Sequence, residues 1–221
     1  MKRVVPSVAT AAWVLMGASA AHAEAAGGKW ADGKWYVHAG PAQITLADKA
    51  TIKLAGTLVP GAGYSSDPQT TTVVEIGREL TSNWSASVTL GLPPKAEAQG
   101  SGSIAGIGML GTATYGPSAV TIHYHFNEGG AFRPYIGAGL TYMHVFDTSD
   151  GAMNRLEVDD AFGTVLQVGF DYNFSDKWSV FIDAKQAFLE TNATGSIGGA
   201  PVTADMVFNP QVIGAGVGFR F

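Results

Sequence analysis

Apolar and polar residues alternate one by one along several segments of the chain, most clearly at its end. One side of residues 209–221 is apolar and the other carries mainly Gly and Arg; the apolar side holds Ile213, Ala215, Val217, Phe219 and Phe221. Alternation with a period of two residues is typical of a β-strand with one apolar face. Further segments of this kind cover residues 35–46, 71–79, 84–92, 118–126, 132–146, 161–174 and 178–190. We therefore predict an all-β fold of eight antiparallel strands.

The connections between these predicted strands alternate between long and short. Segments rich in Gly, Ser, Thr, Asp and Pro predict long loops at residues 47–70, 93–117, 147–160 and 191–208, the first with a short strand at 52–58. The other connections, residues 80–83, 127–131 and 175–177, are short enough for tight turns. Extended external loops and short periplasmic turns are typical of outer-membrane barrels. The prediction is therefore an eight-stranded antiparallel transmembrane β-barrel, residues 35–221, with its apolar faces toward lipid.

Aromatic residues gather at the short-turn ends of the predicted strands. Such side chains prefer the headgroup level of a membrane, so we predict a girdle at the periplasmic rim formed by Trp35, Trp84, Phe126, Phe132, Phe174, Trp178, Phe219 and Phe221. We also expect the terminal strand, which ends on Phe221, to pair with the first strand and close the sheet. The same strand is expected to engage the barrel-assembly machinery.

The N-terminus predicts export. Basic Lys2 and Arg3 precede a mostly apolar run, and Ala21-His22-Ala23 has the form of a cleavage site. Residues 1–23 are therefore predicted to be a signal peptide and residues 24–34 a flexible leader; a single-span anchor is the alternative, which polar residues within the run disfavour. The expected location is the bacterial outer membrane.

Composition supports this location. Only 14% of the residues are charged, against about 25% in a typical soluble domain. No later segment offers the roughly 20 consecutive apolar residues of a membrane helix, which leaves a barrel as the way to span lipid. The net charge of −5 argues against a nucleic-acid partner, and the expected partners are membrane lipid and apolar solutes.

A soluble barrel that binds its ligand inside, as lipocalins do, is the structural alternative. Its apolar faces would point inward, but eight strands enclose too little room for this many Trp and Phe side chains. A terminal Phe221 would also have no membrane interface to occupy. The transmembrane arrangement is therefore favoured.

Several segments resemble the outer-membrane protein W family. They are Phe132-Arg133-Pro134-Tyr135-Ile136-Gly137-Ala138-Gly139-Leu140-Thr141-Tyr142, Gln167-Val168-Gly169-Phe170-Asp171-Tyr172, the ending Gly218-Phe219-Arg220-Phe221, and Leu92-Pro93-Pro94. The resemblance covers roughly residues 84–221. It implies an eight-stranded barrel with a narrow, largely apolar lumen for passive entry of small hydrophobic molecules. The Gly-rich second loop departs from the family pattern.

We expect an apolar funnel in the external loops and the upper barrel, lined by Leu54, Leu58, Val59, Ile104, Ile107, Met109 and Leu110. The lower lumen of so small a barrel is filled by side chains, so a solute would leave sideways into the membrane. The alternative is that these aliphatic residues only pack the loops together.

Polar side chains of the predicted strands point into the lower lumen. They include His123, His125, Arg133 and Tyr135, together with Glu75, Asp171, Asp183 and Lys185, and burial favours pairing of the charged ones. His123 and His125 have a spacing that could ligate a metal, but no third ligand is near in sequence, so hydrogen bonding in the lumen is favoured. The glycines of residues 106–111 match a dinucleotide fingerprint without a surrounding βαβ unit. We therefore expect neither a metal nor a cofactor.

Two other classes of function are compatible with an eight-stranded outer-membrane barrel. Some eight-stranded outer-membrane barrels modify lipid A, and His144 lies on the outward side of its predicted strand near the external rim. No Ser is placed beside it as a nucleophile, so we do not expect an enzyme. A structural, adhesive or receptor barrel without transport is the other alternative.

Overall fold

The last strand of the chain, β15 (Gln211–Arg220), pairs with the first, β1 (Trp35–Thr45). Backbone hydrogen bonds join Trp35 and Phe221 in both directions, at 3.1 and 2.9 Å. This pairing confirms the expected role of the terminal strand in closing the sheet. The computed structural model describes residues 34–47, 49–127 and 130–221, so the predicted signal peptide lies outside the described residues, as does the leader apart from Lys34.

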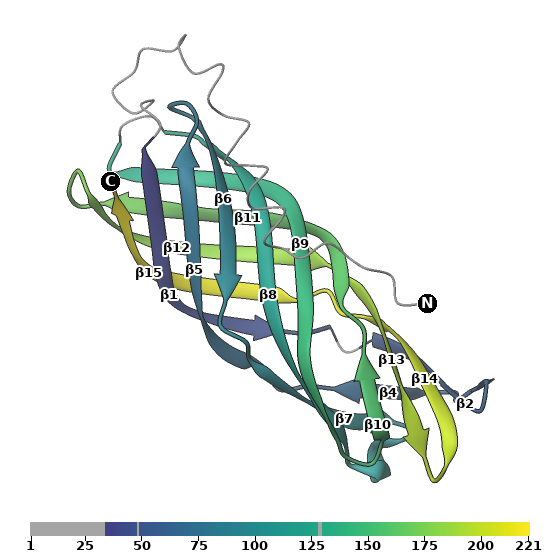
Figure 1. Ribbon diagram of the computed structural model, residues 1–221. Helices are drawn as coiled ribbons and strands as arrows, with labels where there is room; N and C mark the ends of the chain where they lie inside the picture. Colours follow the sequence, from purple (N-terminus) through teal and green to yellow (C-terminus); the bar gives the residue numbers. More distant parts are fainter. Residues whose placement is uncertain (1–33, 48, 128–129) are drawn as a thin grey trace.

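Eight strands form the closed barrel, in the order β8-β6-β5-β1-β15-β12-β11-β9, and β9 pairs back onto β8 (Figure 1). All neighbours are antiparallel. The remaining barrel strands are β5 (Gln69–Glu79), β6 (Trp84–Gly91), β8 (Met109–His125), β9 (Phe132–Asp150), β11 (Ala161–Asn173) and β12 (Trp178–Phe188). The predicted eight-stranded antiparallel barrel is confirmed. No helix within the described residues is long and apolar enough to cross a membrane.

The strands turn their apolar sides outward. On β6, Ser85 and Ser87 are buried, whereas Trp84 and Leu90 are about half exposed. The same division holds on β11, where Val168 is 56% exposed and Gln167 only 3%. A sheet whose exposed face is apolar and whose interior is polar matches a barrel surrounded by lipid. The outward orientation of the apolar faces is therefore confirmed.

The segments predicted as long loops are mostly strands, which corrects the sequence analysis. They contain β2 (Lys49–Leu54), β3 (Thr57–Leu58), β4 (Ala62–Ser65), β7 (Lys95–Gly102), β10 (Asn154–Val158), β13 (Glu190–Ile197) and β14 (Ala200–Val207), with one short 3-10 turn, η1 (Ala105–Ile107). Strands β8 and β9 also continue past their predicted bounds to Met109 and Asp150. Alternation is present here too, but several of the buried positions hold small residues such as Ala193 and Ala204, which weakens the apolar signal.

Two tight hairpins order this outer part. Gly198 and Gly199 both have positive φ angles, 59° and 85°, between the paired residues Ile197 and Ala200. Ala55 and Gly56 make the same kind of turn between β2 and β3, with φ angles of 48° and 79°. Two-residue turns with positive φ at both positions match the twist of a hairpin. Short rigid turns therefore replace flexible loop tips at both places.

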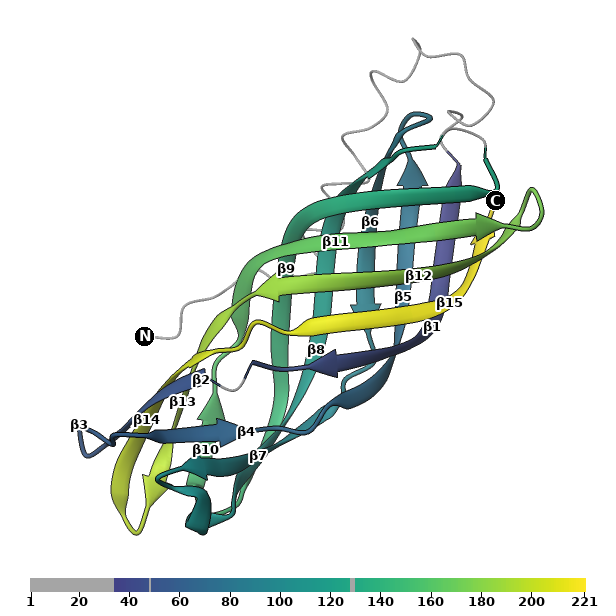
Figure 2. The ribbon, with the colours of Figure 1, turned by 180° about the vertical axis from the view of Figure 1, so that it is seen from behind.

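The outer strands extend the barrel at the end away from the C-terminus (Figure 2). A second sheet, in the order β10-β13-β14-β2-β3, lies opposite the β4-β7-β8 edge of the main sheet. Inward side chains of both sheets form a buried apolar cluster that includes Ile52, Tyr64, Leu110 and Met153. We call this the outer end of the molecule, and the end with the short connections the turn end.

Candidate conduit and its polar base

An upper cavity lies within the outer end. Its volume is about 900 Å³, including the part that is open to solvent. Its walls come from opposite sides of the extension, with Ile52 on β2, Leu110 on β8 and Val202 on β14. None of the described residues that line it is charged. The cavity therefore offers an apolar environment at the outer end of the protein.

A lower cavity continues into the barrel. Its volume, again including the part that is open to solvent, is about 670 Å³. The lining residues include Ile44, Val165, Ala187 and Leu189. Asp183 and Lys185 are the charged side chains among the described residues that line it. The lower cavity is thus apolar at its sides and polar at its base.

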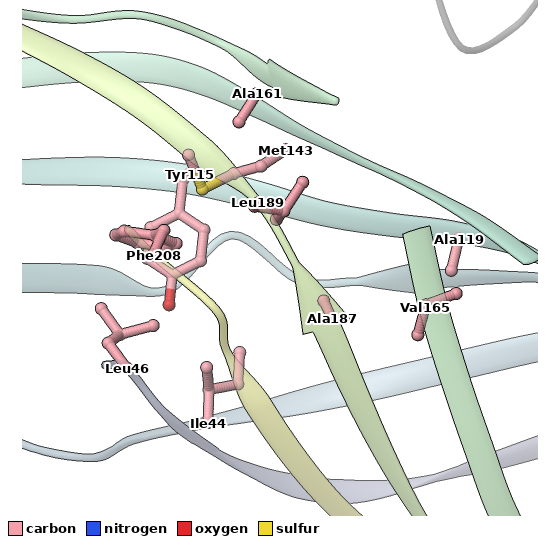
Figure 3. Close-up of a cluster of buried hydrophobic side chains, with 10 residues drawn as sticks. All are labelled: Ile44, Leu46, Tyr115, Ala119, Met143, Ala161, Val165, Ala187, Leu189 and Phe208. Carbon is pink, nitrogen blue, oxygen red and sulfur yellow. The ribbon is translucent and has the colours of Figure 1, made fainter. Parts of the chain in front are cut away.

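Three side chains line both cavities: Tyr115, Met143 and Phe208. The rings of Tyr115 and Phe208 meet edge to face, with centroids 5.8 Å apart, and Met143 lies beside them (Figure 3). The Tyr115 hydroxyl donates a hydrogen bond of 3.0 Å to Oε1 of Gln69. These residues form the constriction between the two cavities.

Below the lower cavity, paired charges and hydrogen bonds fill the lumen. We call this region the polar plug; it contains His38, Glu75, Glu79, Ser85, His123, His125, Arg133, Tyr135, Gln167, Asp171, Asp183 and Lys185, all of them buried. Lys185 Nζ contacts Asp183 Oδ2 at 2.7 Å and Glu75 Oε2 at 3.2 Å. Gln167 donates to Asp183 at 2.8 Å. Pairing offsets the cost of removing these charges from water, and these buried side chains fill the lumen between the lower cavity and the turn end.

The remaining charges of the plug are also paired. Arg133 Nη1 donates to Glu79 Oε1 at 2.9 Å, and His38 Nε2 lies 3.1 Å from Asp171 Oδ1. The expected pairing of buried lumen charges is therefore observed, but Glu79, the partner of Arg133, was not among the residues singled out from the sequence.

His123 and His125 belong to the same hydrogen-bonded network. His123 contacts Gln167 Oε1 and Thr121 Oγ1, each at 2.9 Å, and His125 contacts Ser85 Oγ at 3.0 Å. The described residues contain no group of three or more His, Cys, Asp or Glu side chains placed to hold a metal ion. Both histidines thus lie in a network of neutral hydrogen-bonding side chains.

The wall of the lower cavity is interrupted between β6 and β8. Their ladder ends at the pair Leu90 and Ser118, and pairing resumes where the N–H of Tyr115 donates to the carbonyl of Pro94 at 3.2 Å. Gly91 and Pro117 lie between these points and line the cavity. Gly91 has no side chain and Pro117 no backbone N–H. Among the described residues no ladder pair joins the two strands between these points, and we call this place the seam.

The predicted lining residues fall into three groups. Ile104 and Leu110 line the upper cavity. Leu54, Leu58, Ile107 and Met109 are exposed, and Val59 is partly exposed, near hairpin tips and η1; none of these five lines either cavity in the part of the chain that the structure describes. His123, His125, Arg133 and Tyr135 lie in the polar plug, below the cavities.

Several lining residues were not found from the sequence. Tyr115, Met153, Leu156, Val202 and Phe208 all lie in segments that were predicted as loops. The available signal was the spacing of two between inward residues such as Val202 and Ala204. The Gly-Gly pair before them was a second signal, because it is typical of a tight hairpin.

The eight aromatic residues predicted for the girdle all lie at the turn end of barrel strands. Trp178 and Phe219 are in ring contact at 4.8 Å, and Phe219 stacks on Phe221 at 6.1 Å. Their contact with lipid headgroups stays a prediction.

Two acidic side chains fix connections at the outer end. Asp160 contacts His144 Nδ1 at 3.0 Å and accepts a hydrogen bond from the Tyr142 hydroxyl at 2.7 Å. Asp150 accepts hydrogen bonds from the backbone N–H groups of Leu156 and Arg155, at 2.9 and 2.8 Å. These two bonds lower the pKa of the Asp150 carboxyl, because they favour its charged form.

The model of the OmpW family matches residues 31–221. The chain belongs to this family. OmpW-family proteins are outer-membrane barrels, and the protein is accordingly a β-barrel of the bacterial outer membrane. The resemblance stated from strand motifs is thereby confirmed.

Individual relatives agree with this assignment. The dibenzothiophene metabolism operon protein PahQ of Pseudomonas aeruginosa is 28% identical over 193 residues, which cover 87% of this chain and 91% of PahQ. Outer membrane protein AlkL of Ectopseudomonas oleovorans is 28% identical over 170 residues, 77% of this chain and 74% of AlkL. The crystal structure of the outer membrane protein OprG from Pseudomonas aeruginosa superposes with a TM-score of 0.80 at 21% identity, covering 86% of this chain and 96% of OprG. OprG therefore shares the fold.

Proposed function

We propose that this OmpW-family barrel is a passive channel for small hydrophobic molecules, which enter at the outer end and leave sideways into the membrane. The observation that carries the proposal is the order of environments along the lumen. Two apolar cavities follow one another, and a charged, hydrogen-bonded plug fills the lumen beneath them. An apolar solute gains from leaving water for such cavities but would lose that gain among the paired charges of the plug.

The seam between β6 and β8 supports the sideways exit. Gly91 and Pro117 face the lower cavity on its inner side, and Leu92, next in the chain, is 64% exposed on the outside. A solute that passes between them moves from one apolar environment to another. The polar plug is avoided on this route.

The exposed aliphatic residues near the outer tips supply the entrance in this proposal. Leu54, Leu58, Val59, Ile107 and Met109 lie near the turns that border the extension. Apolar surface at an otherwise polar rim attracts apolar solutes. Ile104 and Leu110 then continue the apolar lining inward.

The names of relatives agree with an apolar solute. PahQ is named for an operon of dibenzothiophene metabolism, and dibenzothiophene is an apolar aromatic compound. Transport would need no catalysis, and in the described part of the chain the hydrogen bonds of His144 go to Asp160 rather than to a hydroxyl nucleophile. We infer that the protein is not an enzyme, and that its terminal strand engages the barrel-assembly machinery.

Uptake into liposomes tests the proposal. Octane, octanol and a sugar would be offered to lipid vesicles with and without the protein, and the uptake in excess of that into empty vesicles should rise with solute hydrophobicity. Ala187→Phe should reduce uptake because it fills the lower cavity, which Ala187 lines. Ala184→Phe is the matched control, since Ala184 lies on the outward side of the same strand. Equal uptake by protein-containing and empty vesicles would refute the channel.

A further inference from the structure

The lower cavity has a polar base that a purely hydrophobic solute does not need. Asp183 and Lys185 project into it from β12 and are only 4% and 7% exposed. Their contact at 2.7 Å is part of the plug, yet both also border the cavity where an apolar solute would lie. The chemistry of these two side chains decides which solutes fit best.

Asp183 has one oxygen that is committed and one that is not. Its Oδ2 accepts hydrogen bonds from Gln167 at 2.8 Å, Lys185 at 2.7 Å and Tyr135 at 3.4 Å. Its Oδ1 accepts none from the described residues. This oxygen is not fully enclosed by the protein. Oδ1 therefore keeps surface that a small molecule can reach, and it can only accept a hydrogen bond.

Lys185 complements this acceptor. An ammonium group has three N–H donors, and two are taken by Asp183 and Glu75 at 2.7 and 3.2 Å. The third remains for a ligand next to Asp183. The base of the cavity thus presents one acceptor and one donor side by side.

The hydroxyl groups that line the cavity do not compete for these sites. Thr89 donates to Glu75, Ser118 to the carbonyl of Tyr142 and Thr141 to the carbonyl of Ser118, each at 2.9 Å. Their protons are therefore committed within the protein. The cavity walls above the base are formed by apolar side chains such as Val165 and Leu189.

We propose that the lower cavity binds apolar molecules that carry one hydroxyl group, with the hydroxyl donating to Asp183 Oδ1 and accepting from Lys185 Nζ. A hydroxyl is both donor and acceptor, so it satisfies both groups at once. An ether satisfies only Lys185, and an alkane satisfies neither. A carboxylate meets the negative charges of Asp183 and Glu75. This inference rests on the proposed uptake of hydrophobic solutes and narrows it to a preferred class.

Equilibrium binding to the protein in lipid nanodiscs tests the preference. The probes are radiolabelled 1-octanol, methyl octyl ether, octane and octanoate, and binding is counted in excess of nanodiscs without protein. Because 1-octanol makes one more hydrogen bond to a charged group than the ether and two more than octane, it should bind about tenfold more tightly than the ether and more tightly still than octane. Octanoate should bind most weakly.

Two variants separate the head-group site from the apolar walls. Asp183→Leu should abolish the preference for 1-octanol over the ether while octane still binds. Val165→Ala, on the cavity wall, should weaken all of the uncharged probes alike. If Asp183→Leu does not fold, Asp183→Asn replaces it, because it keeps the shape of the side chain but removes the charged acceptor and should reduce the preference.

The outcomes distinguish this inference from the channel itself. Excess binding of octane without any preference for 1-octanol overturns the head-group site and leaves the channel standing. A preference that survives in the Asp183 variants also overturns it. If no probe binds beyond empty nanodiscs, both the head-group site and the proposed hydrophobic conduit fail.

Discussion

Tyr115 and Phe208 meet edge to face at the boundary between the two cavities, with ring planes at 88°. They come from β8 and from the connection that follows β14, so the contact joins two opposite sides of the outer end. Any solute that moves from the upper to the lower cavity passes this pair. In the proposed channel, we therefore expect the size of the gap between the rings and Met143 to limit which solutes pass.

Phe208→Ala should widen this constriction. Uptake of a branched or polycyclic hydrocarbon into vesicles should rise more than uptake of a linear alkane, because only bulky solutes are limited by the gap. The substitution should also lower the free energy of unfolding by about 3–5 kcal/mol, as expected for removing a buried ring. Phe146→Ala is the control, since Phe146 is 58% exposed. An unchanged ratio of bulky to linear uptake would exclude the pair as the limiting point.

The seam between β6 and β8 can be closed from within. A Cβ on Gly91 would lie 2.7 Å from Cγ of Pro117, closer than van der Waals contact allows. Gly91→Val should therefore fill the seam or shift the Pro117 ring, and it should slow the release of apolar solute into the membrane without blocking its binding in the cavities. Vesicle uptake and nanodisc binding measure the two steps separately. Leu90→Val, on the lipid face of the same strand, should change neither.

The ion pair between Arg133 and Glu79 should stabilise the polar plug, because each buried charge is neutralised by the other. Arg133 is 1% exposed and Glu79 3%, and among the described residues Arg133→Leu leaves the Glu79 carboxylate with only the more distant cation Arg220, whose Nη2 lies at 3.9 Å. Removing one partner of a buried pair costs about 3–5 kcal/mol. Urea unfolding of the single variant should show this loss, and the double variant with Glu79→Leu should recover part of it. A double variant as unstable as the sum of both singles would show that the two residues do not depend on each other.

The barrel could be predicted because lipid imposes a strict pattern. Residues such as Leu90 and Val168 must be apolar where acyl chains surround them, so each barrel strand shows its period in the sequence. The outer strands lack this contrast. Some of their inward residues, such as Ala193 and Ala204, are small, and many of their outward residues are polar, so the composition favoured loops.

Most of the residues that line the cavities could not be predicted, for a different reason. They depend on which side chains meet across the lumen, and a pattern within one strand does not reveal this. Tyr115 and Phe208 are distant in sequence and lay in predicted loops. The partners within the plug could not be predicted for the same reason. Strand parity indicated that Arg133 points inward, but only the arrangement of the strands shows that Glu79 accepts its hydrogen bond.

Asp150 should make the order of the outer end depend on pH. Its carboxylate accepts the backbone N–H groups of Leu156 and Arg155, and Leu156 lines the upper cavity. Because the folded state lowers the pKa of Asp150, the stabilising effect is fully present above the ordinary pKa of Asp, about 3.9, and is lost as the pH falls through the lower folded value. Hydrogen exchange of the Leu156 amide, corrected for intrinsic rates, should therefore be slow at neutral pH and accelerate in acid. Asp150→Ala should exchange quickly at every pH, whereas equal protection in both proteins at neutral pH would show that the carboxylate does not hold this turn.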